Sequence, residues 1–75
     1  MESEIAKLIN QKVKVIYQDD LGFIRIKRGT ILGVDDLFLT VEAEGKDFIK
    51  VIIPIKQVLR VEVLKEGSYG NKQNN

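Results

Sequence analysis

Between residues 12 and 64, apolar and polar residues alternate in short runs, which is the pattern of half-buried β-strands. Segments that contain Asp and Gly interrupt this alternation and predict turns between the strands. Pro54 ends the fourth run, because proline has no N–H to donate to a neighbouring strand. The pattern predicts five antiparallel strands, at residues 13–17, 23–32, 37–43, 48–53 and 58–64.

The second predicted strand is the longest, and Gly29 lies inside it. A glycine in the middle of a strand is typical of a bulge or a sharp bend, as small barrels need at their corners. Residues 44–47 form a further predicted turn, where Gly45 is available for a positive φ angle. We therefore expect an all-β fold, a small, strongly bent, five-stranded antiparallel barrel.

The segment that precedes the strands predicts a short α-helix over residues 2–10. Ser3 is a suitable N-cap, and Ile5, Leu8 and Ile9 form one narrow apolar stripe. A helix of this length is not stable alone in water, so we expect its apolar stripe to dock on the sheet.

The expected organisation is one domain over residues 1–64, with the strands inside 12–64, followed by a disordered polar tail over residues 65–75. A chain this short without cross-links often gains stability by forming oligomers. No segment is long and apolar enough to span a membrane, and the acidic start of the chain is unlike a secretory signal. A cytoplasmic location is the expectation.

Composition limits the chemistry of this chain. There is no Cys and no His, which excludes disulfides and the usual structural zinc sites. The carboxylate pairs Asp19-Asp20 and Asp35-Asp36 lie in predicted turns, where Asp is favoured for local hydrogen bonds. With no nucleophile beside a base, we expect neither catalysis nor a metal or cofactor. Twelve basic against eleven acidic residues give a net charge of +1, so any nucleic-acid contact depends on a local basic patch.

Four segments together resemble the Sm-like family, over about residues 4 to 64. They are an alternating first strand, a Gly in a long second strand, an Asp-containing turn and an apolar third strand: Val13-Lys14-Val15, Arg28-Gly29-Thr30-Ile31-Leu32, Val34-Asp35-Asp36 and Leu37-Phe38-Leu39. The family has a short N-terminal helix before a bent five-stranded barrel, so the resemblance implies the same fold here.

Two branches of that family are most similar. The C-terminal domain of the ribosome-maturation factor RimP has segments similar to Gly33-Val34-Asp35-Asp36 and Val51-Ile52-Ile53-Pro54. The RNA chaperone Hfq has a first strand similar to Val13-Lys14-Val15-Ile16-Tyr17, and its Lys-His motif falls on Lys56-Gln57. This chain departs from the family's RNA sites, because the base-stacking aromatic falls on Leu37 and the Asn after the Asp turn is absent.

The resemblance implies a non-catalytic RNA-binding or RNA-chaperone protein that acts as a homo-oligomeric ring of about five to seven subunits. Lys56 is the expected phosphate contact, with Gln57 on base edges, whereas Asp36 would repel phosphate if it faced the pore. Arg25, Lys27 and Arg28 form a basic stripe along the second strand, a possible track for an RNA backbone. The RNA-site residues expected are Lys56, Gln57, Asp36, Leu37, Arg25, Lys27 and Arg28.

Each of these assignments has a plainer alternative. Lys56 and Gln57 are also what a solvated tight turn requires, and the basic stripe also fits an ordinary solvated sheet face paired with acids such as Glu42. The aromatic residues are more typical of a core than of base stacking: Tyr17, Phe23, Phe38 and Phe48.

The fourth and fifth strands are the expected assembly surface. Exposed apolar strand edges invite pairing, and in Sm-like rings these two strands pair between neighbouring subunits. The expected subunit-interface residues are Val51, Ile52, Ile53, Val58 and Arg60. The alternative is a monomeric or dimeric protein-interaction module that docks on a ribonucleoprotein or regulatory complex by edge-strand pairing.

Overall fold

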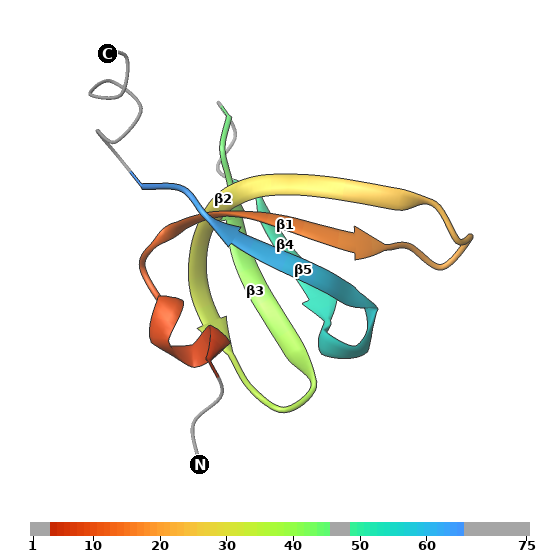
Figure 1. The fold of residues 1–75 in the computed structure, drawn as a ribbon, viewed down its shortest axis with the longest axis horizontal. Coiled ribbons are helices and arrows are strands. Elements are labelled where there is room, and N and C mark those ends of the chain that lie inside the picture. The colour runs from red at the N-terminus through yellow and green to blue at the C-terminus, as the bar shows by residue number, and fades with distance from the viewer. Residues whose placement is uncertain (1–3, 46–48, 66–75) are drawn as a thin grey trace.

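The computed structural model describes residues 4–45 and 49–65 of this 75-residue chain. They form one antiparallel sheet of five strands with two short 3-10 helices (Figure 1). The all-β class is confirmed. The predicted tail lies outside the described residues except for Lys65, as do Ser3 and the start of the predicted fourth strand. The strands are β1 Lys12–Gln18, β2 Ile24–Val34, β3 Phe38–Ala43, β4 Lys50–Pro54 and β5 Val58–Val63.

The predicted N-terminal α-helix over residues 2–10 is wrong in type and length. Its described part is a single 3-10 helix, η1, from Ile5–Leu8, with no side-chain cap at Glu4. The Asn10 N–H donates to the Ile31 carbonyl at 2.7 Å, and Asn10 takes a φ of 74°. The left-handed turn at Asn10 ends the helix, because the backbone of Asn10 is hydrogen-bonded to β2. Ile5 and Leu8 still pack on the core, as their spacing predicts.

The sheet has the order β4-β3-β2-β1-β5, so β4 and β5 are its two edges. Within residues 4–45 and 49–65 these edges do not pair with each other, and the strands therefore form an open sheet where a barrel was predicted. A second 3-10 helix, η2 Ile55–Gln57, connects the two edge strands. In Figure 1 the sheet is strongly curved, and the β1–β2 hairpin extends beyond the other strands.

Strand β2 changes partner along its length. It pairs with β1 from Ile24 to Thr30 and with β3 from Gly29 to Val34, so both pairings coincide only at Gly29 and Thr30. A Cβ atom on Gly29 would lie 2.1 Å from the Glu42 carbonyl oxygen, a distance that no side chain tolerates. Glycine is therefore required at this corner by close backbone approach. The register shift itself lies further on, between Ile31 and Gly33.

The core lies on the concave face of the curved sheet. Its fully buried members come from four strands and are all aliphatic: Val13, Val15, Ile31, Leu39, Val41 and Ile53. The fifth strand contributes less than its alternation predicts. The alternation of Leu59, Val61 and Val63 with Arg60 and Glu62 predicts that these three apolar side chains face inward. A register shift in the β1–β5 pairing instead leaves Leu59 without a cross-strand partner, and its side chain is exposed.

Among the described residues there is no helix of the length and hydropathy needed to cross a membrane.

Candidate functional site

The turn between β2 and β3 meets η2 at one end of the sheet and forms an open groove of about 410 Å³. The groove brings together three residues of the predicted RNA site, Asp36, Leu37 and Lys56. Sequence reasoning did not assign the other lining residues to this site. They are Phe38, Pro54 and Ile55.

The β2–β3 side of the groove is held by Asp35. Its Oδ1 atom accepts hydrogen bonds from the N–H groups of Leu37 and Phe38, both at 2.8 Å, and the Asp35 N–H donates to the Phe38 carbonyl at 3.0 Å. The backbone N–H of Phe38, followed by that of Leu37, lowers the pKa of the Asp35 carboxyl below its usual value. Asp35 thus fixes the turn through its own backbone neighbours, which is the use of Asp that a turn sequence predicts.

The opposite side of the groove is attached to this turn through the backbone. The Ile55 N–H at the start of η2 donates to the Leu37 carbonyl at 2.8 Å, and Pro54 pairs with Phe38 in the β3–β4 register. Leu37 is 68% exposed and Phe38 44% exposed, so both present apolar surface to solvent. Lys56 is exposed, and no described residue provides a carboxylate partner for it. The groove therefore combines the Lys56 ammonium group and the Asp36 carboxylate with an aromatic ring and aliphatic side chains.

Gln57 follows Lys56 directly but is not part of the groove. Its Nε2 atom donates to Asp20 Oδ1 in the β1–β2 turn at 2.8 Å. This bond attaches η2 to the β1–β2 hairpin next to the last residue pair of β1 and β5, Tyr17 with Val58. The role of Gln57 on base edges stays a prediction, and its amide is hydrogen-bonded to Asp20.

The predicted basic stripe lies apart from the groove. Arg25 and Lys27 pair in register with Tyr17 and Val15 and so share one face of the hairpin, as their spacing predicts, whereas Arg28 lies on the other face. The Arg25 Nε atom contacts Asp19 Oδ2 at 2.8 Å.

Asp19 is held from two sides. The Arg25 side chain, followed by the backbone N–H of Phe23, lowers the pKa of the Asp19 carboxyl. The Arg25 guanidinium also lies 5.7 Å from the centre of the Phe23 ring. Arg25 is therefore occupied by the hairpin itself, and Lys27 and Arg28 are the stripe's available cations.

The predicted interface residues divide between the core and the surface. Ile53 is a fully packed core residue, and Val51 and Val58 are half-buried against the core. Ile52 is 61% exposed on the edge strand β4. Arg60 on the other edge strand forms an ion pair with Glu62 at 2.7 Å.

An apolar hollow of about 350 Å³ lies along the β5 edge, between η1 and the strand. It exposes aliphatic side chains from three elements, including Ile5, Leu8, Ile55 and Leu59. Glu62 beside it accepts from Lys14 at 3.3 Å, and this contact, followed by the nearby charge of Arg60, lowers the pKa of Glu62. The β5 edge is thus mostly apolar where it faces η1, although Glu4 and Arg60 also line the hollow, and it is charged on the convex face.

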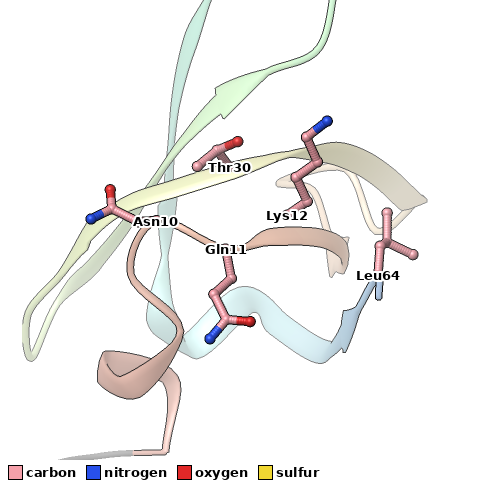
Figure 2. A pocket seen from close by; sticks show the side chains of 5 residues that line it. All are labelled: Asn10, Gln11, Lys12, Thr30 and Leu64. Carbon is pink, nitrogen blue, oxygen red and sulfur yellow. The ribbon is translucent and has the colours of Figure 1, made fainter. Parts of the chain in front are cut away.

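A polar hollow of about 350 Å³ lies where the chain passes from η1 into β1. Figure 2 shows that its side chains do not converge: Lys12 and Thr30 project to one side of β1, and Gln11 projects to the other. A ligand would find no cluster of polar groups aimed at one point there. We do not assign it a function.

Within residues 4–45 and 49–65 no group of three or more acidic side chains is placed to hold a metal ion. Comparisons with protein-family models, with curated proteins and with solved structures find no match.

Proposed function

We propose that this chain is a non-catalytic, Sm-like RNA-binding protein that works as a homo-oligomeric ring. The observation that carries the proposal is the groove, where Lys56 lies beside the exposed surfaces of Leu37 and Phe38. An ammonium group neutralises a phosphate, and an exposed aromatic ring stacks on a base, which is the usual pairing of contacts on single-stranded RNA. In this proposal Phe38 takes the stacking role that the family places at the position of Leu37.

Assembly is part of the proposal because one groove offers few contacts. A single cation and a single ring give weak binding, whereas several grooves on one assembly raise the effective concentration of each for the same RNA. The two unpaired edge strands, with Ile52 and Leu59 exposed, support pairing between copies. Pairing β4 of one copy with β5 of the next is a head-to-tail contact that closes into a ring.

The RNA assignment is tested with the Lys56→Ala variant and a fluorescently labelled single-stranded RNA, over a salt titration. We expect weaker binding and a log Kd–log salt slope that falls by about 0.7 for each subunit that contacts the RNA. Lys7→Ala is the matched control, because it removes the same charge from an exposed site outside the groove. Equal losses in both variants would assign the effect to net charge and reject the groove.

The aromatic contact is tested separately with Phe38→Leu, which keeps an apolar side chain and removes the ring. Loss of base stacking costs about 1–3 kcal/mol per base, so we expect at least a fivefold weaker Kd with an unchanged salt slope. Phe23→Leu, an exposed ring on the hairpin, is the control. Binding that depends on Phe23 and not on Phe38 would move the RNA site to the hairpin.

A second candidate function is a monomeric or dimeric protein-interaction module, which the same exposed edges β4 and β5 favour. Light scattering at two protein concentrations separates the two. A stable mass of about five to seven chains supports the ring, whereas a monomer at both concentrations removes it and leaves the module.

A further inference from the structure

The first half of β2 is a third open edge, distinct from β4 and β5. β1 pairs with β2 along Ile24–Thr30, but β3 begins to pair only at Gly29. Figure 1 shows this stretch in the part of the hairpin that extends past β3. One side of β2 is therefore unpaired over Ile24 to Lys27 within the described residues.

The backbone groups that face this open side belong to Ile24 and Ile26. Antiparallel strands direct the N–H and C=O groups of alternate residues to opposite sides. The Phe23 carbonyl accepts from Asp19 on the β1 side, whereas the Arg28 carbonyl accepts from Glu44 on the β3 side at 3.0 Å. The backbone N–H and C=O groups of even-numbered residues of β2 thus point away from β1. Among residues 4–45 and 49–65, no strand pairs with those groups before Arg28.

The side chains that border this edge are apolar and basic. Ile24 and Ile26 are 57% and 58% exposed, and both lie on the convex face of the hairpin. Lys27 lies on the concave face and Arg28 on the convex face, and neither has a carboxylate partner among the described residues. A hollow of about 380 Å³ runs beside the edge, bounded by Ile26, Lys27 and Arg28 on one side and by Ala43, Glu44, Ile49 and Val51 on the other.

Charge decides between the possible occupants of this edge. A second copy of β2 would bring its Arg25, Lys27 and Arg28 close to the same three cations of the first strand, and like charges opposed across strands are destabilising. RNA would satisfy the cations but has no alternating N–H and C=O groups for the backbone of Ile24 and Ile26, and isoleucine offers no stacking surface. An extended peptide with alternating apolar and acidic residues satisfies the backbone groups, the two isoleucines on the convex face and Lys27 on the concave face together.

We propose that the β2 edge at Ile24–Lys27 is a docking site for an acidic, extended segment of a partner protein, which adds to the sheet as a sixth strand. The apolar residues of that segment lie on Ile24 and Ile26 on the convex face, and its carboxylates lie on the concave face near Lys27. This site is separate from the groove of Lys56 and does not depend on RNA binding.

The test uses a labelled peptide of about eight residues that alternates Val and Glu, added to the full chain. Binding is read by fluorescence anisotropy, and its location by amide hydrogen exchange resolved by NMR. We expect the Ile24 and Ile26 amides to exchange at least about tenfold more slowly with the peptide bound. Lys27→Glu should weaken binding at least about tenfold, and Lys7→Glu, the same charge reversal on η1, should leave it within about twofold.

A peptide of opposite charge and a proline variant of the edge test the charge and the backbone contacts separately. A Val–Lys peptide of the same length should not bind, because it differs from the Val–Glu peptide only in charge and the cations of the edge repel it. Ile26→Pro removes one N–H from the open side and should abolish binding while β1 stays paired. If Ile26→Pro does not fold, the exchange of the Ile26 amide in the unaltered chain gives the same information.

Several outcomes would overturn the proposal. These are no binding of the Val–Glu peptide, binding that Lys27→Glu leaves unchanged, and protection confined to β4 or β5. Protection of Ile26 that rises with protein concentration alone would identify a second copy as the occupant. Protection by single-stranded RNA and not by the peptide would make the edge part of a nucleic-acid surface.

Discussion

The two halves of β2 both carry isoleucine, but only the second half buries it. In the second half Ile31 is completely buried in the core, whereas in the first half Ile24 and Ile26 are more than half exposed. The register explains the difference, because Arg25, Lys27, Gly29 and Ile31 share the concave face and the isoleucines of the first half lie on the convex face. Alternation therefore tells which side chains share a face of a strand, and the tertiary fold decides which face is covered.

The comparison is tested most strongly by removing the same side chain from each half. Ile31→Ala should lower the free energy of unfolding by about 2–5 kcal/mol, because it leaves a cavity in the core. Ile26→Ala should lower it by less than about 0.5 kcal/mol, because the side chain is already in water. Urea denaturation measures both. If Ile31→Ala does not fold, Ile31→Val, at about 0.5–1.5 kcal/mol, replaces it; equal effects at positions 26 and 31 would contradict the register.

The junction between the halves is tested at Gly29. Gly29→Ala should lower the free energy of unfolding by about 1–3 kcal/mol, since the new Cβ meets the backbone of Glu42 and Ala43 and the strands must separate. Gly33→Ala is the matched control, because a Cβ there meets nothing within 4 Å. The control should be unchanged or more stable by up to about 1 kcal/mol. A tolerated Gly29→Ala would mean that β2 and β3 do not approach this closely.

The smallest effect that we expect is the loss of stability at acid pH when the Asp residues of the two turns become protonated. Asp19 anchors the first half of β2 and Asp35 follows the second, and hydrogen bonds lower the pKa of both carboxyls in the folded chain. Groups of this kind stabilise the fold above their unfolded pKa and lose that contribution as the pH falls through the folded pKa. The urea midpoint should therefore be level above about pH 5 and fall below about pH 4.

Asparagine variants identify which turn matters for global stability. Asp35→Asn keeps an oxygen acceptor for Leu37 and Phe38 but does not titrate, so its acid decline should be shallower than that of the unaltered chain. Asp19→Asn should change the decline less, because the hairpin it anchors is outside the core. A larger change from Asp19→Asn would show that the projecting hairpin contributes more to stability than its burial indicates.

Much of the fold follows from local signals. The five strands, the turns at Asp19 and Asp35 and the special requirement at Gly29 all come from alternation and turn chemistry. The helix type was wrong, because the pattern carries no information on how soon the chain must join β2 through Asn10. The open sheet was also not predicted, since whether two edges meet depends on curvature summed over every strand.

The groove was only partly predictable. Lys56, Asp36 and Leu37 were assigned to one site through resemblance, and the structure places them together. Phe38 and Ile55 were not assigned, because their contribution depends on the pairing of Phe38 with Pro54 and on the bond between Ile55 and Leu37. The hydrogen bond between Gln57 and Asp20 could not be predicted from local sequence, because the two residues are 37 positions apart.

The hydrogen bond between Gln57 and Asp20 attaches the tip of the β1–β2 hairpin to η2. The same hairpin carries the edge at Ile24 and Ile26, and Gln57 adjoins Lys56 in the groove. An occupant of one site that shifts the Asp20–Gln57 bond alters affinity at the other. Where that bond shifts, thermodynamic linkage requires the two ligands to change each other's binding by the same factor.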